Sequence, residues 1–197
     1  GFRAIVGGFR VPPGFMLERA RNAQRALALK VKFSGVKPEH VRFVGGVDLS
    51  YPSQGRARAA IVVLDFESLS LREARVVEAE VRFPYVPTLL SFREAPAIFK
   101  AASKLSLKPD VLMVDGQGVA HPYGCGLASH VGVVLGMATI GVAKRLLCGE
   151  LGPRRGDQAP IMFEGREVGR ALWTGRSLKP IHVSVGHMVS LDDAVEI

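Results

Sequence analysis

Residues 110–115 read DVLMVD, and residues 127–135 and 138–143 follow with a helical pattern and a second apolar run. This strand–helix–strand order is typical of a unit in which a helix joins two parallel strands. Asp115 ends the first of these strands and is followed directly by Gly116-Gln117-Gly118. The stretch therefore predicts a parallel sheet with an acidic group at the edge where such sheets bind ligands.

Three more strands are predicted before this unit, at residues 41–49, 58–66 and 74–83. Their short connections favour an antiparallel meander. We therefore predict an α/β protein with a mixed central sheet, an antiparallel meander followed by parallel strands, flanked by helices. This order is typical of the ribonuclease H-like fold, and residues 1–197 are long enough to form one domain around a continuous core.

The remaining segments predict helices and a hairpin. After residues 84–87 (PYVP), Thr88 is expected to cap a helix that Pro96 breaks or kinks, because proline lacks a backbone N–H and clashes with the preceding turn. Glu94 would then lie near the end of that helix. The other expected elements are a helix with Met16, Ala20, Ala23 and Leu27 on one face, a helix over residues 97–105, a hairpin over 161–172, a strand over 181–185 and a last helix capped by Ser190.

The charge balance indicates a polyanionic partner. The chain has 26 Lys and Arg against 18 Asp and Glu, a formal net charge of +8. A basic surface binds nucleic acid through counterion release, although a basic soluble protein without such a partner would have the same composition. No apolar run is long enough to span a membrane. Two cysteines cannot build a disulfide framework, so we expect a reducing, cytoplasmic setting.

Two acidic residues end predicted strands, Asp48 after Gly45-Gly46-Val47 and Asp115 before Gly116. Ionised carboxylates resist burial unless they are paired or bind a metal. If the two strands are neighbours, the carboxylates converge, and a set of oxygen ligands favours Mg²⁺ or Mn²⁺. The alternative is that each aspartate caps a turn or a helix. Spacing alone does not single out Glu94 from the other glutamates as a third ligand.

Several segments taken together resemble one known family. They occur in a single order between about residue 40 and residue 190, which is most of the chain. Taken together they are far more specific than any one of them. The chain is similar to endonuclease V in residues 47–51 (VDLSY), 84–87 (PYVP), 92–94 (FRE), 115–122 (DGQGVAHP), 126–130 (GLASH) and 139–144 (TIGVAK).

This resemblance implies a ribonuclease H-like DNA-repair nuclease that recognises hypoxanthine, which is deaminated adenine. The family cuts the same strand one nucleotide to the 3′ side of the lesion with magnesium, leaving 3′-hydroxyl and 5′-phosphate ends. Mn²⁺ is expected to substitute. The resemblance assigns Asp48, Glu94 and Asp115 as metal ligands. It assigns Lys144 to transition-state charge, and His187 to the attacking water or a second ion.

The resemblance also implies how the lesion is bound. The segment Pro84, Tyr85, Val86 and Pro87 matches a wedge that enters the duplex and takes the place of a displaced base. His130, on an apolar helix face, is expected to be structural. The lesion pocket is expected to comprise Leu90, Gly116, Gly118, His121, Leu127, Gly141 and Ala143. The phosphate-facing surface is expected to include Arg56, Arg58, Arg93, Arg145, Arg154 and Arg155.

Alternatives remain open at this point. The chemistry also suits an inosine-specific endoribonuclease, and the fold suits a non-catalytic nucleic-acid-binding module. The chain departs from the family pattern at Thr88, Tyr123 and Arg145, and the family is expected to continue beyond Ile197 with a further helix and a basic tail. The expected partner is inosine-containing nucleic acid, with no membrane, no obligate protein partner and a monomeric state.

Overall fold

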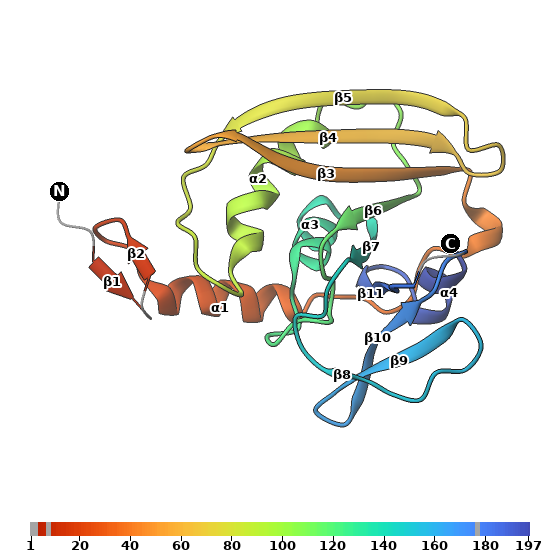
Figure 1. Ribbon diagram of the computed structural model, residues 1–197. Helices are drawn as coiled ribbons and strands as arrows, with labels where there is room; N and C mark the ends of the chain where they lie inside the picture. The colour runs from red at the N-terminus through yellow and green to blue at the C-terminus, as the bar shows by residue number, and fades with distance from the viewer. Residues whose placement is uncertain (1–3, 7–8, 176–177) are drawn as a thin grey trace.

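One mixed β-sheet forms the centre of the molecule (Figure 1). The computed structural model describes residues 4–6, 9–175 and 178–197. The strands of the sheet are β3 (Phe43–Ser53), β4 (Arg56–Asp65), β5 (Leu71–Glu80), β6 (Val111–Asp115), β7 (Ala138–Ala143), β8 (Glu150–Leu151), β9 (Gln158–Phe163), β10 (Arg166–Leu172) and β11 (Ile181–His187). They are hydrogen-bonded in the order β5-β4-β3-β6-β7-β11-β10-β9-β8.

The topology confirms the predicted mixed sheet. β3, β4 and β5 form an antiparallel meander, and β3, β6 and β7 run parallel to one another. β11 then pairs antiparallel with β7, and β10 and β9 continue as the predicted hairpin. The carboxyl end of β6 therefore lies beside the middle of β3, where Asp48 follows Val47.

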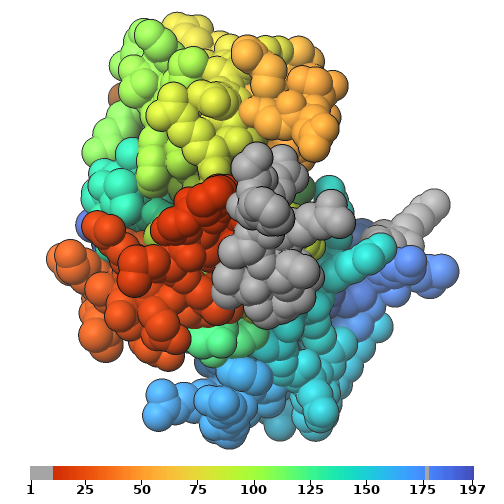
Figure 2. Space-filling model, turned by 90° about the vertical axis from the view of Figure 1, so that its left-hand side faces the viewer, coloured from red at the N-terminus to blue at the C-terminus, as the bar shows by residue number. Residues whose placement is uncertain are grey.

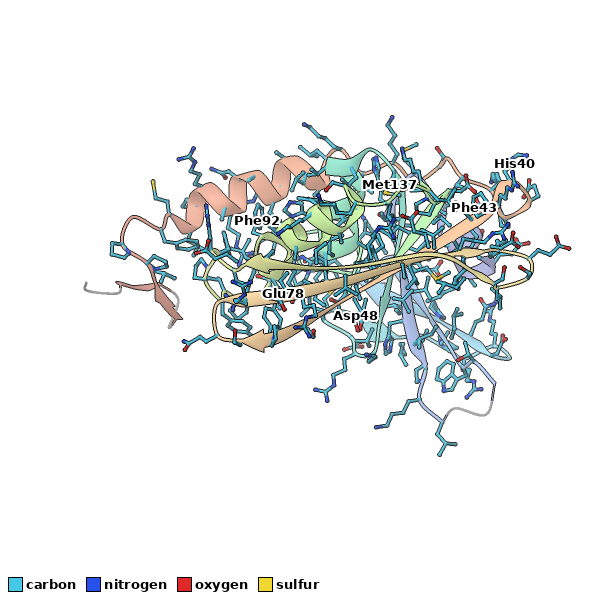
Figure 3. The ribbon with its side chains drawn as sticks, turned by 90° about the horizontal axis from the view of Figure 1, so that it is seen from above. His40, Phe43, Asp48, Glu78, Phe92 and Met137 are labelled. Carbon is cyan, nitrogen blue, oxygen red and sulfur yellow. The ribbon has the colours of Figure 1, made fainter. Side chains whose placement is uncertain are left out.

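Helices cover the sheet on both faces. The helices are α1 (Leu17–Ala28), α2 (Leu90–Ala102), α3 (Leu127–Leu135) and α4 (Leu191–Glu196), with a 3₁₀ turn at Pro38–His40 and a separate ribbon of β1 (Ala4–Val6) and β2 (Phe9–Val11). α2 and α3 bury Ile98 and Val131 against Ile61 and Leu112 of the sheet. Figure 3 shows Phe92 and Met137 on the helix side of the strands and Asp48 on the other side. No helix within the described residues is long and apolar enough to cross a membrane.

The helix after the wedge segment differs from the prediction. α2 is one helix that contains Pro96, so Glu94 lies within it, and its N-cap is Leu89 rather than Thr88. Pro96 removes one backbone hydrogen bond. The same helix buries Ala95 and Ile98 completely in the core beneath the sheet, so burial of this face outweighs the lost hydrogen bond.

Two other predictions were wrong in detail. The first strand does not end at Leu49 but continues to Ser53, because a tight turn at Gly55, with φ of 78°, lets it pair onward with β4. In α1 the predicted apolar face is rotated. Met16 is 64% exposed, and Gln24 is the fully buried residue of this helix. The last helix is capped as predicted, with the Ser190 hydroxyl accepting the Asp193 N–H.

Candidate active site

Asp48 and Asp115 lie at neighbouring positions of two parallel strands. The register pairs Val47 of β3 with Val114 of β6, so the next residue on each strand is the aspartate. Side chains alternate along a strand, so both carboxylates stand on the face opposite to α2 and α3. They line a depression of about 460 Å³ whose other walls are mostly apolar. The parallel register thus brings Asp115, at the end of β6, next to Asp48 in the middle of β3.

Lys144 supplies a positive charge at the same place. It directly follows β7, the neighbour of β6, and its Nζ lies 3.2 Å from Asp115 Oδ2. The hydrogen bond with Asp115 raises the pKa of Lys144, and the charges of Asp115 and Asp48 raise it further. The ammonium group is exposed, so it can contact a phosphate of a bound strand.

Glu94 approaches this edge from the helix side. The Tyr51 hydroxyl of β3 donates a 2.8 Å hydrogen bond to Glu94 Oε1. Burial raises the pKa of Glu94, and repulsion from Asp115 and Asp48 raises it further, against the lowering effects of Tyr51 and Arg93. Glu94 is therefore close enough to Asp115 and Asp48 for their negative charges to act on it.

The donor set suits a hard divalent cation. All three side chains offer oxygen, which is the ligand atom that Mg²⁺ and Mn²⁺ prefer. Each carboxylate also has a donor of its own, since Leu49 N–H bonds Asp48, Tyr51 bonds Glu94 and Lys144 bonds Asp115. Among the described residues, no three acidic, histidine or cysteine side chains are placed so that they could hold a metal ion together. Asp48, Glu94 and Asp115 are the oxygen donors that would have to turn toward a shared cation, which would relieve the repulsion on Glu94.

The structure does not bring His187 to the carboxylates. β11 runs antiparallel to β7, and His187 pairs with Thr139 at the start of β7, whereas Asp115 pairs with Val142 near its end. The His187 ring is buried, and its Nδ1 accepts the Lys32 N–H at 3.1 Å. His182, at the start of β11, is the histidine that pairs with Ala143 beside Lys144. The antiparallel direction of β11 decides this, and sequence reasoning did not consider it.

The small residues expected in the lesion pocket pack backbone against backbone. A Cβ on Gly118 would overlap the Val185 carbonyl, and one on Gly141 would overlap the Gly118 backbone. Gly116 and Leu127 are also neighbours, since a Cβ on Gly116 would lie 3.3 Å from Leu127 Cβ. Of the other predicted pocket residues, His121 and Ala143 are buried, while Leu90 is half-buried as the first residue of α2.

The wedge segment is anchored on one side and exposed on the other. Val86 is 4% exposed and packs in a cluster with Val11 and Leu89, whereas Tyr85 is 57% exposed. The flanking Pro84 and Pro87 are half-buried. The segment therefore presents an exposed aromatic ring on a turn that is packed against the core through Val86.

The predicted phosphate-facing arginines do not form one group. Arg56 and Arg58 of β4 both pair with Glu78, and the register Ser50↔Arg58 and Asp48↔Ala60 places Arg58 on the same face as Asp48. Arg93 donates to the Phe83 carbonyl at 2.8 Å, and Arg154 stacks over the Trp173 ring at 4.1 Å. Arg145 and Arg155 are exposed.

Comparison with known proteins decides the family. The Endonuclease V family model matches residues 25–197. The chain belongs to the endonuclease V family. Endonuclease V of Thermofilum pendens is 46% identical over 188 residues, covering 95% of this chain and 81% of the relative.

Solved endonuclease V structures share the fold. The crystal structure of the Streptomyces avermitilis endonuclease V superposes with a TM-score of 0.84 at 43% identity, covering 93% of this chain and 83% of the other. The Ciona intestinalis endonuclease V, in complex with a 24mer DNA containing an inosine followed by a ribo-adenosine, superposes with a TM-score of 0.83 at 28% identity, covering 91% and 87%. These matches confirm the resemblance and the ribonuclease H-like fold, and membership supports a nuclease.

Two buried histidines give this endonuclease V family member a pH-dependent stability. Burial lowers the pKa of His130 from 6.5 to about 4. Burial and the nearby positive charge of Arg21 lower the pKa of His121 to about 4 as well. His130 Nδ1 lies 3.0 Å from Ser91 Oγ, and its ring packs edge-on against Phe92, as expected for a structural histidine.

The folded state therefore holds both rings neutral where the unfolded chain protonates them. Their contribution to stability is complete above pH 6.5 and is lost as the pH falls toward 4. At pH 5 the loss due to His130 alone is about 2 kcal/mol. We expect His130→Gln to reduce the change in the free energy of unfolding, measured with urea, between pH 7 and pH 5. His40→Gln, at an exposed histidine, is expected to leave this pH dependence unchanged. If the free energy of unfolding changed equally with pH in the unaltered protein and in both variants, this account would be wrong.

Proposed function

We propose that this protein is a magnesium-dependent endonuclease that recognises hypoxanthine in DNA and hydrolyses the phosphodiester one nucleotide to its 3′ side. The observation that carries the proposal is the neighbouring placement of Asp48 on β3 and Asp115 at the end of β6, with Glu94 close enough for both charges to raise its pKa and with Lys144 bonded to Asp115. The inosine-containing DNA in the Ciona relative supports the choice of substrate.

Asp48, Glu94 and Asp115 would hold the magnesium. When bound, this ion supplies an activated water and stabilises the leaving 3′-oxygen without a covalent enzyme intermediate. Lys144 is exposed next to Asp115, so its ammonium group can bind the scissile phosphate and stabilise charge that develops there. Tyr51 orients Glu94 through its hydroxyl.

The other residues select the lesion. Extruding a base costs a few kcal/mol, and the exposed ring of Tyr85 can stack in the vacated space to offset this cost. The lesion pocket would be lined by the loop after β6, which carries Gly116 and His121, since backbone packing closes the space at Gly118 and Gly141. Arg58 lies on the same face as Asp48, where it can contact the DNA backbone near the carboxylates.

The test is a labelled duplex with one deoxyinosine, next to an identical duplex with adenine. With Mg²⁺ we expect one cut, one nucleotide 3′ of the inosine, at a rate about a hundredfold or more above the adenine duplex. EDTA is expected to abolish it. An inosine RNA, and a duplex with a ribonucleotide after the inosine, separate the DNA nuclease from the endoribonuclease. Inosine-selective binding without any cutting would instead support the non-catalytic module.

A further inference from the structure

Two polar side chains of α1 reach the loops that carry the wedge and the pocket. Arg21 and Gln24 lie one helical turn apart, and Gln24 is completely buried. Arg21 Nη1 donates to Gln24 Oε1 at 2.9 Å, so the two side chains form one unit. Burying a polar amide costs free energy that an apolar residue at the same position would not. The buried side chain of Gln24 therefore calls for hydrogen-bond partners that offset this cost.

The first contact of this unit is the end of the wedge segment. Gln24 Nε2 donates to the Thr88 carbonyl at 2.7 Å, and Arg21 Nη2 donates to Thr88 Oγ1 at 2.7 Å. Thr88 has φ of 64°, a left-handed conformation that is costly for a β-branched residue. The contacts from α1 thus hold the wedge segment at a residue whose backbone would otherwise relax.

The second contact is the loop between β6 and α3. Gln24 Nε2 also donates to the Cys125 carbonyl at 3.1 Å, and the Arg21 guanidinium stacks 4.0 Å from the centre of the Tyr123 ring. The Tyr123 N–H in turn donates to His121 Nδ1 at 3.0 Å. One pair of side chains therefore joins two loops that are far apart in sequence and that carry Tyr85 and His121.

We propose that Arg21 and Gln24 are positioning residues that fix the wedge segment relative to the pocket loop, so that insertion of Tyr85 and capture of the displaced base occur together. We name this unit the α1 clasp, comprising Arg21, Gln24, the Thr88 and Cys125 carbonyls and the Tyr123 ring. Its role in base capture rests on the proposed function. Its role in holding the two loops together does not, and is measured separately.

The first test measures hydrogen–deuterium exchange in the free protein. Arg21→Met keeps most of the side-chain stem and removes the guanidinium. Arg25→Met, one turn along the same helix at an exposed position, removes the same charge and is the matched control. We expect the backbone amides of both loops, residues 85–90 and 119–126, to exchange about tenfold faster in Arg21→Met. Their exchange rates should be unchanged in the control. Unchanged exchange in either loop of Arg21→Met would overturn the clasp.

The second test measures binding in EDTA to inosine and adenine duplexes with 2-aminopurine beside the test base, which reports unstacking. In Arg21→Met the preference for the inosine duplex over the adenine duplex is expected to fall about tenfold. The increase in 2-aminopurine fluorescence on binding should become smaller to match. Affinity for the adenine duplex should equal that of Arg25→Met. An equal loss for both duplexes would make Arg21 a mere phosphate contact and overturn its role in capture. If the unaltered protein showed no preference for inosine, the proposed function would fail, and the exchange experiment would still decide the clasp.

Discussion

Asp115→Asn is expected to reduce cleavage of the deoxyinosine duplex on the order of a thousandfold while leaving the protein folded. Asp115 ends β6 beside Asp48, and its Oδ2 lies 3.2 Å from Lys144 Nζ. It therefore takes part both in the pair of carboxylates and in the ion pair with Lys144. An amide has the same shape but lacks the negative charge that retains a divalent ion. Losing several kcal/mol of transition-state stabilisation corresponds to a rate loss of this size.

Folding should tolerate this change. The Asp115 side chain is 34% exposed, and neutralising it removes its repulsion with Glu94. We therefore expect the thermal midpoint to stay the same or rise, which separates a loss of chemistry from a loss of structure. Nicking assays with Mg²⁺, together with thermal unfolding of the same sample, measure both effects.

The matched control is Asp110, which directly precedes the first residue of the same strand. Its Oδ2 accepts the backbone N–H groups of Arg42 and Phe43 at 2.9 and 2.8 Å. Asp110→Asn is therefore expected to lower stability and to keep the cleavage rate within about threefold of the unaltered protein. If Asp115→Asn cut as fast as Asp110→Asn, the carboxylate assignment would be wrong.

Gly118→Ala is expected to destabilise the protein by about 3 kcal/mol, because the new methyl group would occupy the space of the Val185 carbonyl in β11. The obstacle is backbone rather than a flexible side chain, so a strand or a loop has to move. The Gly118 N–H also donates to Ser184 Oγ at 2.9 Å, and this buried hydrogen bond would be strained by the same movement. Urea unfolding measures the loss as a lower midpoint.

Gly46→Ala is the comparison for this substitution. Gly46 lies on β3, and a Cβ there would lie 3.6 Å from Val62 Cγ2, an ordinary contact distance. Its effect on the free energy of unfolding is expected to stay within about 0.5 kcal/mol. Similar midpoints for Gly118→Ala and Gly46→Ala would show that the loop after β6 moves freely away from β11. The tight backbone pocket would then not exist.

Local sequence patterns predicted what depends on neighbours in the chain. The apolar runs predicted β3 and β6, although β3 continues past Asp48 to Ser53, and their parallel pairing then placed Asp48 next to Asp115. The capping box at Ser190 was also correct, because a cap involves residues only three positions apart. The end of α2 was not, since the burial of Ala95 and Ile98 outweighs the local penalty of Pro96.

Side-chain partners far apart in sequence were beyond that reasoning. Gln24 was missed because a glutamine in an amphipathic helix is ordinarily exposed, and its acceptors at Thr88 and Cys125 belong to two other segments. His187 was assigned to the carboxylates from resemblance alone. The direction of β11 pairs it with Thr139 at the start of β7, whereas Asp115 pairs with Val142, and only strand pairing reveals that direction.

The sequence by itself therefore determined the element types, the mixed sheet, the family and the acidic end of β6, because periodicity and motif order are local properties of the chain. Tertiary structure alone decided which residues meet. It placed Lys144 on Asp115, Tyr51 on Glu94 and α1 on both loops, and it kept His187 away. The physical reason is that these contacts depend on strand register and helix docking, which the burial of the whole core fixes at once.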